Sequence, residues 1–435
     1  MTKRMLLAIL LLIVFALPAG CQKQGGEPTQ PTAPAPTILP THTPEPSPTP
    51  TPDPVGEALA GMTVEQKAAQ LLVAGIEGTE PGEDAVQAIQ GYQVGGVILF
   101  GRNVESAEQL AALTNGLKEL NGDYTPLFLC VDQEGGRVDR MPPEVTDLPS
   151  ALDFGSIADP EARMDACFTL GQTLAAQCAA FGFNMDFAPS LDIWSNPENT
   201  VIGDRAFGTD AATVTGAANE TALGILSGGV IPVAKHFPGH GDTAVDSHYG
   251  LPVVDKSLEE LEELELRPFR QAIDTTCVYG TYGGDTSIPA IMVAHILLSQ
   301  IDPDNPASLS PEVVTGLLRE EMGYEGVVCT DDLTMGAISN TYGMGEAAVL
   351  AVEAGCDLLL VCHGADNLAE AHAALVEAVD SGRIPEERLD ESVYRVLSLK
   401  AVYGLSNAPV EAPDIEALND RIAALERSIE ADTSQ

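Results

Sequence analysis

The sequence predicts an α/β protein built as a single (β/α)8 TIM barrel, and three observations lead to this prediction. Apolar runs of strand length recur along the chain, helical patterns separate most of them, and about 350 residues contain eight such units. Continuous apolar strands that alternate with helices are typical of a parallel sheet covered on both faces. Eight units in this length favour a closed barrel over an open doubly wound sheet.

The expected elements follow one another in a regular order. A helix start is predicted at Thr63, because Gln66 three residues later completes a capping box. The expected strands are 71–75, 94–100, 126–131, 183–188, 230–234, 290–294, 326–329 and 357–361. The expected helices are 106–120, 161–181, 210–226, 258–273, 310–322, 345–354, 367–379 and 388–403, and the charged tail after Val410 is also helix-prone.

The N-terminus has the pattern of a cleaved signal peptide. Two positive charges within residues 1–4 precede an apolar run of 12 residues, which is too short for an ordinary membrane span. The following Leu-Pro-Ala-Gly-Cys resembles the lipobox of bacterial lipoproteins, although Pro18 departs from the usual small or aliphatic residue. The resemblance implies that residues 1–20 are a lipoprotein signal peptide and that Cys21 is lipidated. A plainly secreted protein is the alternative.

Residues 21–55 are expected to form an extended linker. Eleven Pro lie between Pro28 and Pro54, with many Thr among them, and such a composition cannot bury a core. At roughly 3 Å per residue the tract could hold the next domain up to about 90 Å from a membrane. The expected domains are then the barrel over 56–405 and a charged C-terminal tail over 406–435.

The net charge of −43 limits the partners of the protein. A strongly acidic chain is repelled by nucleic acid and by anionic membrane surfaces, so direct electrostatic binding to either is not expected. The cysteines after Cys21 include no CxxC pair, which argues against a structural zinc site. Most are expected to be buried small hydrophobic residues, with disulfides left open.

Charged side chains follow five of the expected strands. In a barrel of this type, function concentrates at the C-terminal ends of the strands. A single Asp there is typical of a helix N-cap, which is the expectation for Asp332 taken alone. Five charged strand ends together are better explained by one site. The segments are 132–140, 199–208, 235–236, His295 and 330–335.

The stretch from Lys235 to His248 carries the densest set of titratable groups. Three of the seven His of the chain and two Asp fall within residues 236–248, directly after an expected buried strand. The Gly and Pro among them permit tight turns, so the loop could direct several of these side chains toward one point.

These motifs resemble glycoside hydrolase family 3, and within it the NagZ-like β-N-acetylglucosaminidase branch. The resemblance covers roughly residues 56–405 and implies a single TIM-barrel domain and a retaining, exo-acting hydrolase. Departures are Thr330, where Ser is commoner, and an apparent insertion at 277–287. The matching segments are Asp132-Gln-Glu-Gly-Gly-Arg-Val, Lys235-His-Phe-Pro-Gly-His-Gly-Asp-Thr with Asp246-Ser-His, and Thr330-Asp-Asp-Leu-x-Met.

The resemblance implies catalytic roles for three residues. Asp331 matches the nucleophile, His248 matches the general acid/base, and Asp246 matches the carboxylate that orients this His. Retaining hydrolysis needs a carboxylate nucleophile and an acid/base on opposite sides of the anomeric carbon. A carboxylate that accepts from one imidazole nitrogen fixes the tautomer and leaves the other nitrogen for the leaving oxygen.

The resemblance also implies a set of substrate-binding residues. Carboxylates and cations suit a pyranose ring, because charge-assisted hydrogen bonds to hydroxyls are stronger than neutral ones. His240 and Asp242 are expected to shape the loop, whereas His295 is either close to the site or a satisfied buried His. His42, His363 and His372 are not expected to be catalytic. The implied substrate-binding residues are Asp132, Arg140, Arg205, Lys235 and His236.

The expected function is that of an exo-β-N-acetylglucosaminidase (a β-N-acetylhexosaminidase) that removes terminal GlcNAc from peptidoglycan-derived fragments. Its expected partners are the carbohydrate and, through the lipid anchor, the bilayer on the extracytoplasmic face of the cell envelope. No nucleic acid, cofactor or metal is expected, and a monomer is favoured.

Three alternatives remain. A phosphorylase is possible because a His acid/base does not repel phosphate as a carboxylate would. Another β-glycosidase, such as a β-glucosidase, is disfavoured by the Asp246-Ser-His string. A non-catalytic glycan-binding lipoprotein is disfavoured because a binder would not need Asp331, Asp246 and His248 together.

Overall fold

The computed structural model of the protein describes residues 53–243, 246–248, 250–275 and 288–433. The predicted signal peptide, Cys21, nearly all of the linker and the 277–287 insertion lie outside these residues. The folded part begins with helix α1 (Pro54–Ala60), where the Asp53 carboxylate accepts from the Gly56 amide at 3.0 Å. Asp53 is therefore the N-cap, and the domain starts slightly before the expected boundary at residue 56.

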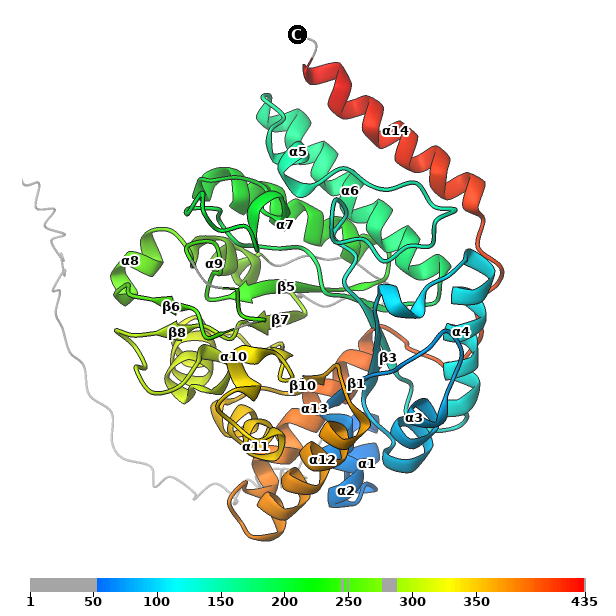
Figure 1. Cartoon of the computed structure of the whole chain (residues 1–435), viewed down its shortest axis with the longest axis vertical. Helices are drawn as coiled ribbons and strands as arrows, with labels where there is room; N and C mark the ends of the chain where they lie inside the picture. Colours follow the sequence, from blue (N-terminus) through cyan, green and yellow to red (C-terminus); the bar gives the residue numbers. More distant parts are fainter. Residues whose placement is uncertain (1–52, 244–245, 249, 276–287, 434–435) are drawn as a thin grey trace, which may run out of the picture. The chain divides into compact units, whose positions relative to one another are not determined.

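Eight parallel strands form a closed barrel in the order β1-β10-β9-β7-β5-β4-β3-β2 (Figure 1). Each strand lies on a predicted one, so the (β/α)8 prediction is confirmed, although β5 and β9 continue beyond their predicted ends. The ring closes through β1, where Val73 is aligned with Gly96 of β2 and Leu360 of β10. The strands are β1 (Leu72–Gly75), β2 (Gly96–Leu99), β3 (Phe128–Val131), β4 (Met185–Asp186), β5 (Ile231–Phe237), β7 (Ala290–Val293), β9 (Val327–Asp332) and β10 (Leu358–Val361). A separate two-stranded sheet joins β6 (Val253–Val254) and β8 (Leu297–Leu298).

Helices surround the barrel. The predicted helix 258–273 is divided into two, because Leu264 leaves the helical conformation shortly before Pro268 starts the second helix. The predicted helix 310–322 is π-helical over Glu312–Glu321, as is Gln87–Tyr92. The α-helices after α1 are α2 (Val64–Gln70), α3 (Glu83–Val86), α4 (Ala107–Asn121), α5 (Ala151–Gly155), α6 (Pro160–Ala180), α7 (Ala211–Ser227), α8 (Leu258–Glu263), α9 (Arg267–Asp274), α10 (Gly336–Ser339), α11 (Met344–Ala354), α12 (Ala365–Asp380), α13 (Glu386–Val402) and α14 (Ile415–Thr433). Short 3-10 turns occur at Gly101–Asn103, Gly203–Arg205 and Ala307–Leu309.

The barrel interior is filled by alternate residues of the strands. Successive side chains of a strand point to opposite faces, so residues two apart share the interior face. The apolar residues that face the interior form one buried cluster, which is distinct from the larger apolar layer between the strands and the helices. In three strands, this series of inward-facing residues ends in a charged side chain at the C-terminal end. The three series are Phe128, Cys130 and Asp132; Ile231, Val233 and Lys235; and Val327, Cys329 and Asp331.

Helix α13 closes the opposite, N-terminal end of the barrel. Its Lys400 is buried, donates to the Gly95 carbonyl at 2.8 Å and to Gln70 Oε1 at 2.9 Å, and lies over the Phe128 ring. Burial lowers the pKa of Lys400 to about 7. The apolar interior is thus bounded by a buried amine below and by charged side chains above.

Asp357, which directly precedes β10, anchors α13 to the barrel. Its buried carboxylate lies 2.5 Å from the Arg319 guanidinium and 3.2 Å from that of Arg395, and it accepts from Ser392 Oγ at 2.7 Å. It also accepts from the Val328 amide of β9 at 3.0 Å. One carboxylate therefore connects two strands with the final helix of the barrel.

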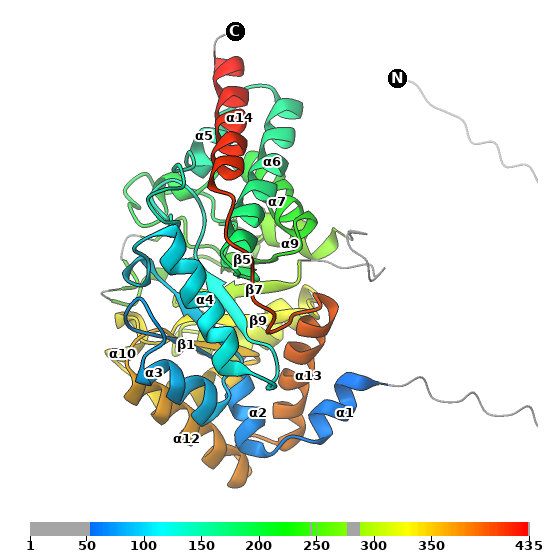
Figure 2. The same ribbon diagram turned by 90° about the vertical axis from the view of Figure 1, so that its right-hand side faces the viewer.

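The C-terminal tail contains a helix that packs on the domain. Helix α14 lies along α6 (Figure 2), and its side chains Leu418, Ile422 and Leu425 are buried at helical spacing. Arg421 of α14 donates to Thr173 Oγ1 of α6 at 3.1 Å. The helix-prone character of the tail is confirmed, and α14 is an outer layer of the barrel domain.

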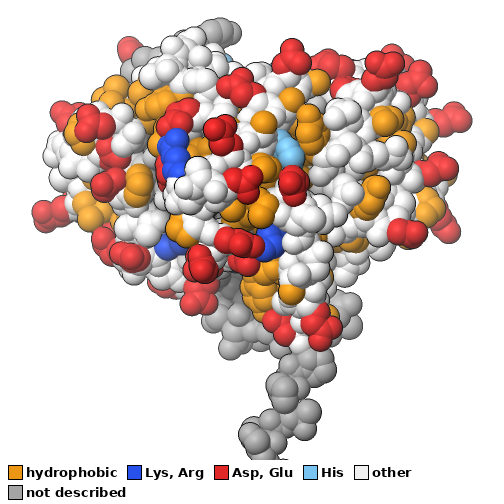
Figure 3. All heavy atoms as spheres, turned by 90° about the horizontal axis from the view of Figure 1, so that it is seen from below, with side chains coloured by type: hydrophobic (Ala, Val, Ile, Leu, Met, Phe, Trp, Pro, Cys, Tyr) orange, Lys and Arg blue, Asp and Glu red, His pale blue; other side chains and the backbone are white. Residues whose placement is uncertain are grey.

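The surface carries the acidic excess of the composition. Figure 3 shows Asp and Glu side chains spread over one face, with few Lys or Arg among them. None of the helices in the described part of the chain combines the length and the hydropathy that crossing a bilayer requires. The six described cysteines are buried free thiols, as expected for small hydrophobic residues.

We predict that Asp357→Asn lowers the free energy of unfolding by about 3 kcal/mol, because it leaves the partly buried guanidinium groups of Arg319 and Arg395 without their counter-charge. Urea unfolding followed by circular dichroism measures the change. Asp123→Asn, the same substitution at an exposed loop position, is the control. Losses of less than 1 kcal/mol in both variants would show that Asp357 does not anchor α13.

Candidate active site

Lys235 is the centre of the charge network at the C-terminal mouth of the barrel. Its ammonium lies 2.6 Å from Asp132 Oδ1 and 2.6 Å from Glu134 Oε1, and its side chain is buried. Burial by itself lowers the pKa of a lysine, but the two carboxylates more than compensate and raise the pKa of Lys235. The buried amine is therefore charged and joins the β3 and β5 strand ends.

Glu134 binds a second cation from another loop. Its carboxylate accepts from Arg205 Nε at 2.8 Å and from Nη2 at 2.7 Å, which is a bidentate pair. Burial favours the protonated acid, yet the charges of Arg205 and Lys235 hold the pKa of Glu134 well below its usual range. Gly135 and Gly136, with φ of 83° and 56°, turn the chain immediately after this residue.

His236 lies between Arg205 and a buried carboxylate. Its Nδ1 is 2.6 Å from Asp192 Oδ2, and its Nε2 is 3.3 Å from Arg205 Nη2. Because a guanidinium only donates, Nε2 accepts and Nδ1 carries the proton given to Asp192. Burial raises the pKa of Asp192, but the His236 and His240 contacts outweigh it and lower this pKa to about 2.

Asp331 and Asp332, at the end of β9, have different environments. Asp332 Oδ1 accepts from the amides of Thr334 and Cys362 at 2.9 and 3.1 Å, so this carboxylate shapes the turn after the strand. Asp331 faces the barrel axis, and its Oδ1 accepts the Asp332 amide at 2.8 Å. Burial opposes ionisation of Asp331, but neighbouring imidazoles, this amide and the Lys235 ammonium lower its pKa below the ordinary value. Asp331 is therefore a carboxylate at neutral pH.

His295 supports the end of β9. It is fully buried, its Nε2 hydrogen-bonds to the Asp332 carbonyl at 2.9 Å, and its Nδ1 lies 2.7 Å from Ser308 Oγ. Burial lowers the pKa of His295 below that of a free imidazole. The residue is thus a satisfied buried His that fixes the backbone next to Asp331.

His248 and Asp246 form a local pair on the loop after β5. His248 Nδ1 lies 2.8 Å from Asp246 Oδ1, which also accepts the His248 amide at 2.9 Å. These bonds outweigh the effect of burial and lower the pKa of Asp246. The His248 side chain is 64% exposed, so its imidazole is accessible from solvent.

Two backbone bonds dock this loop onto the residues after β9. The Gly336 amide donates to the His248 carbonyl at 3.2 Å, and the Ala337 amide donates to the Ser247 carbonyl at 3.0 Å. Both donors lie in the first turn of α10, which follows the Asp331-Asp332 pair. The docking places the exposed imidazole at the same side of the mouth as the Asp331 carboxylate.

His240 shapes the same loop from within. It is buried, its amide donates to Asp192 Oδ1 at 2.6 Å, and its ring nitrogens contact Thr243 Oγ1 at 2.7 Å and Ser247 Oγ at 3.3 Å. Burial lowers the pKa of His240 to about 4, so the ring is neutral. His240 therefore connects Asp192 to the residue that precedes His248.

Asp242 anchors the outer side of the loop. It lies 2.9 Å from Lys256, which also contacts Glu265 at 2.6 Å. Like His240, Asp242 has contacts of a loop-shaping residue in this structure.

The other expected residues lie apart from the network. Arg140 donates to the Asp139 carbonyl and through its amide to Gln133 Oε1, and none of its hydrogen bonds in the described chain reaches Lys235. His372 lies outside the barrel on α12, and His42 is outside the described residues. Among the residues described, no His, Cys, Asp or Glu cluster has the arrangement of a metal site.

The sequence analysis missed Glu134 and Asp192. Glu134 belongs to the segment that begins at Asp132. Its position two residues after Asp132, at the end of the same strand, could have indicated that it lies in the site. Asp192 is a lone acid among apolar residues between Phe187 and Ile193, and this isolation was its only signal.

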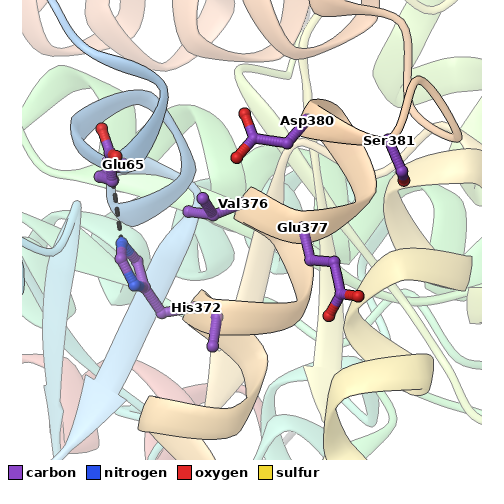
Figure 4. Close-up of a pocket in the computed structure, with 7 residues that line it drawn as sticks. Glu65, His372, Val376, Glu377, Asp380 and Ser381 are labelled. Atoms are coloured by element: carbon purple, nitrogen blue, oxygen red, sulfur yellow. Dashed lines mark hydrogen bonds between the residues drawn. The ribbon is translucent and has the colours of Figure 1, made fainter.

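A separate surface pocket of about 490 Å³ lies on the outside of the barrel (Figure 4). His372 of α12 reaches across to the Glu65 carbonyl of α2 at 3.0 Å, and acidic side chains of α12 border the opening. Neither helix carries a residue of the network at the mouth, so this pocket is not part of the candidate active site.

The closed barrel of parallel strands, with charged side chains gathered at its C-terminal mouth, defines an enzyme of the TIM-barrel class. The chain belongs to glycoside hydrolase family 3, because residues 63–399 match the family model described as the glycosyl hydrolase family 3 N terminal domain.

Relatives and solved structures agree with this assignment. The chain is 35% identical over 331 residues to a β-hexosaminidase of Nitrosomonas eutropha, covering 75% of this chain and 91% of the relative. It is 40% identical over 287 residues to a β-hexosaminidase of Methylococcus capsulatus, covering 66% and 80%. A family 3 β-N-acetylglucosaminidase structure from Paenibacillus sp. str. FPU-7 aligns with a TM-score of 0.78 and 41% identity, over 85% of this chain and 69% of that one.

We predict that His240 makes stability depend on pH. Its pKa is about 4 in the folded protein and about 6.5 in an unfolded chain, so between these values only the unfolded state binds the proton. The free energy of unfolding should therefore fall on acidification through this window, with His240 contributing up to about 3 kcal/mol.

Urea titrations at several pH values between 7 and 4 test this prediction by comparing the wild type with His240→Asn. The variant should show the flatter dependence on pH. His372→Asn, at the α12 histidine, is the matched control and should follow the wild type. Parallel curves for the wild type and His240→Asn would contradict the assignment of the effect to His240.

Proposed function

We propose that the protein is a retaining exo-β-N-acetylglucosaminidase that removes terminal β-linked GlcNAc from cell-wall, peptidoglycan-derived fragments. The observation that carries the proposal is the docking of the His248–Asp246 pair onto the turn that follows the ionised Asp331. A carboxylate nucleophile and a separate acid/base are the two groups that retaining hydrolysis requires.

In the first step, Asp331 attacks the anomeric carbon and the glycosidic C–O bond breaks. The Nε2 proton of His248 passes to the leaving oxygen, so the aglycone departs as an alcohol and a glycosyl ester forms on Asp331. In the second step, His248 takes a proton from water, whose oxygen replaces Asp331 at the anomeric carbon. Asp246 accepts from Nδ1 throughout and stabilises the imidazolium form.

The network around Lys235 would hold the terminal sugar. Lys235 can donate to sugar hydroxyls and Asp132 can accept from them, and such charge-assisted hydrogen bonds are strong. His236 would act mainly by holding this layer in place, because its ring nitrogens already contact Asp192 and Arg205. Arg205 would act mainly through Glu134, because its Nε and Nη2 already donate to that carboxylate. Arg140 would contact substrate only from the rim.

Two kinds of observation support the proposed specificity for GlcNAc and the proposed location of the protein at a membrane. The names of the relatives as β-hexosaminidases and β-N-acetylglucosaminidase support GlcNAc as the sugar removed. The Ala-Gly-Cys21 sequence and the Pro/Thr tract after it support a lipid anchor and a spacer at the outer side of a cell membrane.

A phosphorylase is the second candidate function. The acid/base at this site is an imidazole, and the neighbouring Lys235 and Arg205 are cations, so an incoming phosphate would meet less repulsion than at a carboxylate pair. Assays with and without phosphate separate the candidates, because a phosphorylase releases GlcNAc 1-phosphate and requires phosphate for turnover.

We predict that the full chain hydrolyses an aryl β-N-acetylglucosaminide and not the matching β-glucoside. Asp331→Asn should lower kcat by on the order of 10³-fold or more, because the nucleophile is lost. Asp366→Asn, at an exposed site in the first turn of α12, is the control and should retain activity. Turnover of the glucoside alone would contradict the specificity, and an active Asp331→Asn would contradict the nucleophile.

We predict that the effect of His248→Ala depends on the leaving group. For a poor leaving group such as an alkoxide, kcat/KM should fall by roughly 10²- to 10⁴-fold, because general acid catalysis is lost. For a dinitrophenolate, which leaves without a proton, kcat/KM should change little. Equal losses on both substrates, with an unaffected His372→Ala control, would exclude His248 as the general acid.

A further inference from the structure

Two aromatic rings and a guanidinium meet at the barrel mouth, beside the Lys235 network. Phe100 directly follows β2, and His363 follows β10. Their ring centroids are 5.7 Å apart, with 24° between the ring planes. The Arg102 guanidinium lies 4.6 Å from the centroid of the Phe100 ring. We call Phe100, Arg102 and His363 the aromatic platform.

Hydrogen bonds to two neighbouring strand ends, and one within the turn after β2, hold Phe100 and Arg102 in place. Arg102 Nη2 donates to the Cys362 carbonyl after β10 at 2.9 Å, and its Nε donates to the Ile76 carbonyl after β1 at 3.3 Å. The Phe100 amide donates to Asn103 Oδ1 at 2.9 Å. Arg102 is therefore held by the barrel over one ring of the platform, and the His363 ring is placed by its stacking on Phe100.

The platform extends from the floor of the mouth to its rim. Phe100 is half-buried against the interior cluster, two residues after the inward-facing Ile98. His363 is 55% exposed, and its Nε2 lies 3.8 Å from Asp332 Oδ2, beside Asp331. In the order of the strands, β10, β1 and β2 occupy the arc between Asp331 on β9 and Asp132 on β3. The platform therefore borders both ends of the polar network.

We propose that the aromatic platform is the leaving-group subsite, where the exposed His363 ring, stacked on Phe100 behind it, packs against a second pyranose ring. This inference rests on the proposed function, since an exo-acting enzyme encloses the terminal sugar and leaves the remainder directed outward. The C–H faces of a pyranose are apolar and pack on aromatic planes, and the exposed His363 ring, supported by the nearly parallel Phe100 ring, offers such a surface at the rim. The platform thus favours substrates whose leaving group is itself a sugar.

The test compares two substrates in the full chain and in His363→Ala. The disaccharide of two β-1,4-linked GlcNAc units occupies the platform, whereas β-N-acetylglucosaminyl fluoride has a leaving group too small to reach it. We expect kcat/KM for the disaccharide to fall about 5- to 10-fold, the size of an aromatic contact. The value for the fluoride should stay within about twofold. His363→Phe should restore the disaccharide rate, because it restores the stacking surface.

Two results of this comparison would overturn the proposal. Equal losses of kcat/KM on both substrates would mean that His363 only supports Asp332. Unchanged kcat/KM on both substrates would mean that the platform binds nothing. His372→Ala, the same change on α12, should alter neither rate. If the wild type hydrolyses the fluoride but His363→Ala has no selective effect, the proposed function stands and only the subsite is wrong. A wild type inactive on both substrates overturns the proposed function and the subsite together.

Discussion

The position of Lys235 between Asp132 and Glu134 determines the organisation of the barrel mouth. The buried charges of Lys235 and Glu134 are tolerated there because each one is paired and hydrogen-bonded within the same layer. Arg205 completes the layer through Glu134, and His236 extends it to Asp192. The apolar interior below gives these ion pairs a low-dielectric floor, which strengthens them and makes their geometry rigid.

Asp192 extends this rigidity from the barrel to a loop. One of its oxygens holds the His236 ring, and the other holds the amide of His240, whose ring contacts Ser247 next to His248. The sugar-binding network and the acid/base loop therefore share one buried carboxylate. The positions of the sugar-binding network and of the acid/base loop are therefore connected by hydrogen bonds through Asp192.

The fold was predictable from the sequence because most barrel strands lie in continuous apolar runs, and the positions of all eight were recovered. The site was predictable where strand ends carry charge, as at Lys235 and Asp331. Asp192 was not predicted, because its partners His236 and His240 lie far away in sequence and its only local signal is its position among apolar residues. The break at Leu264 and the packing of α14 on α6 also depend on tertiary contacts that no periodicity encodes.

The parallel pairing of β1 with β10 joins the first strand of the barrel to the last, and this has a consequence for synthesis. Contacts between such distant segments form slowly, and Asp357 gains its contacts with Ser392 and Arg395 only after α13 has emerged. Until then β1 and β9 are open sheet edges, which are templates for association with other chains. The high negative charge makes nascent molecules repel one another during this interval, so the acidic surface also protects the unfinished ring from aggregation.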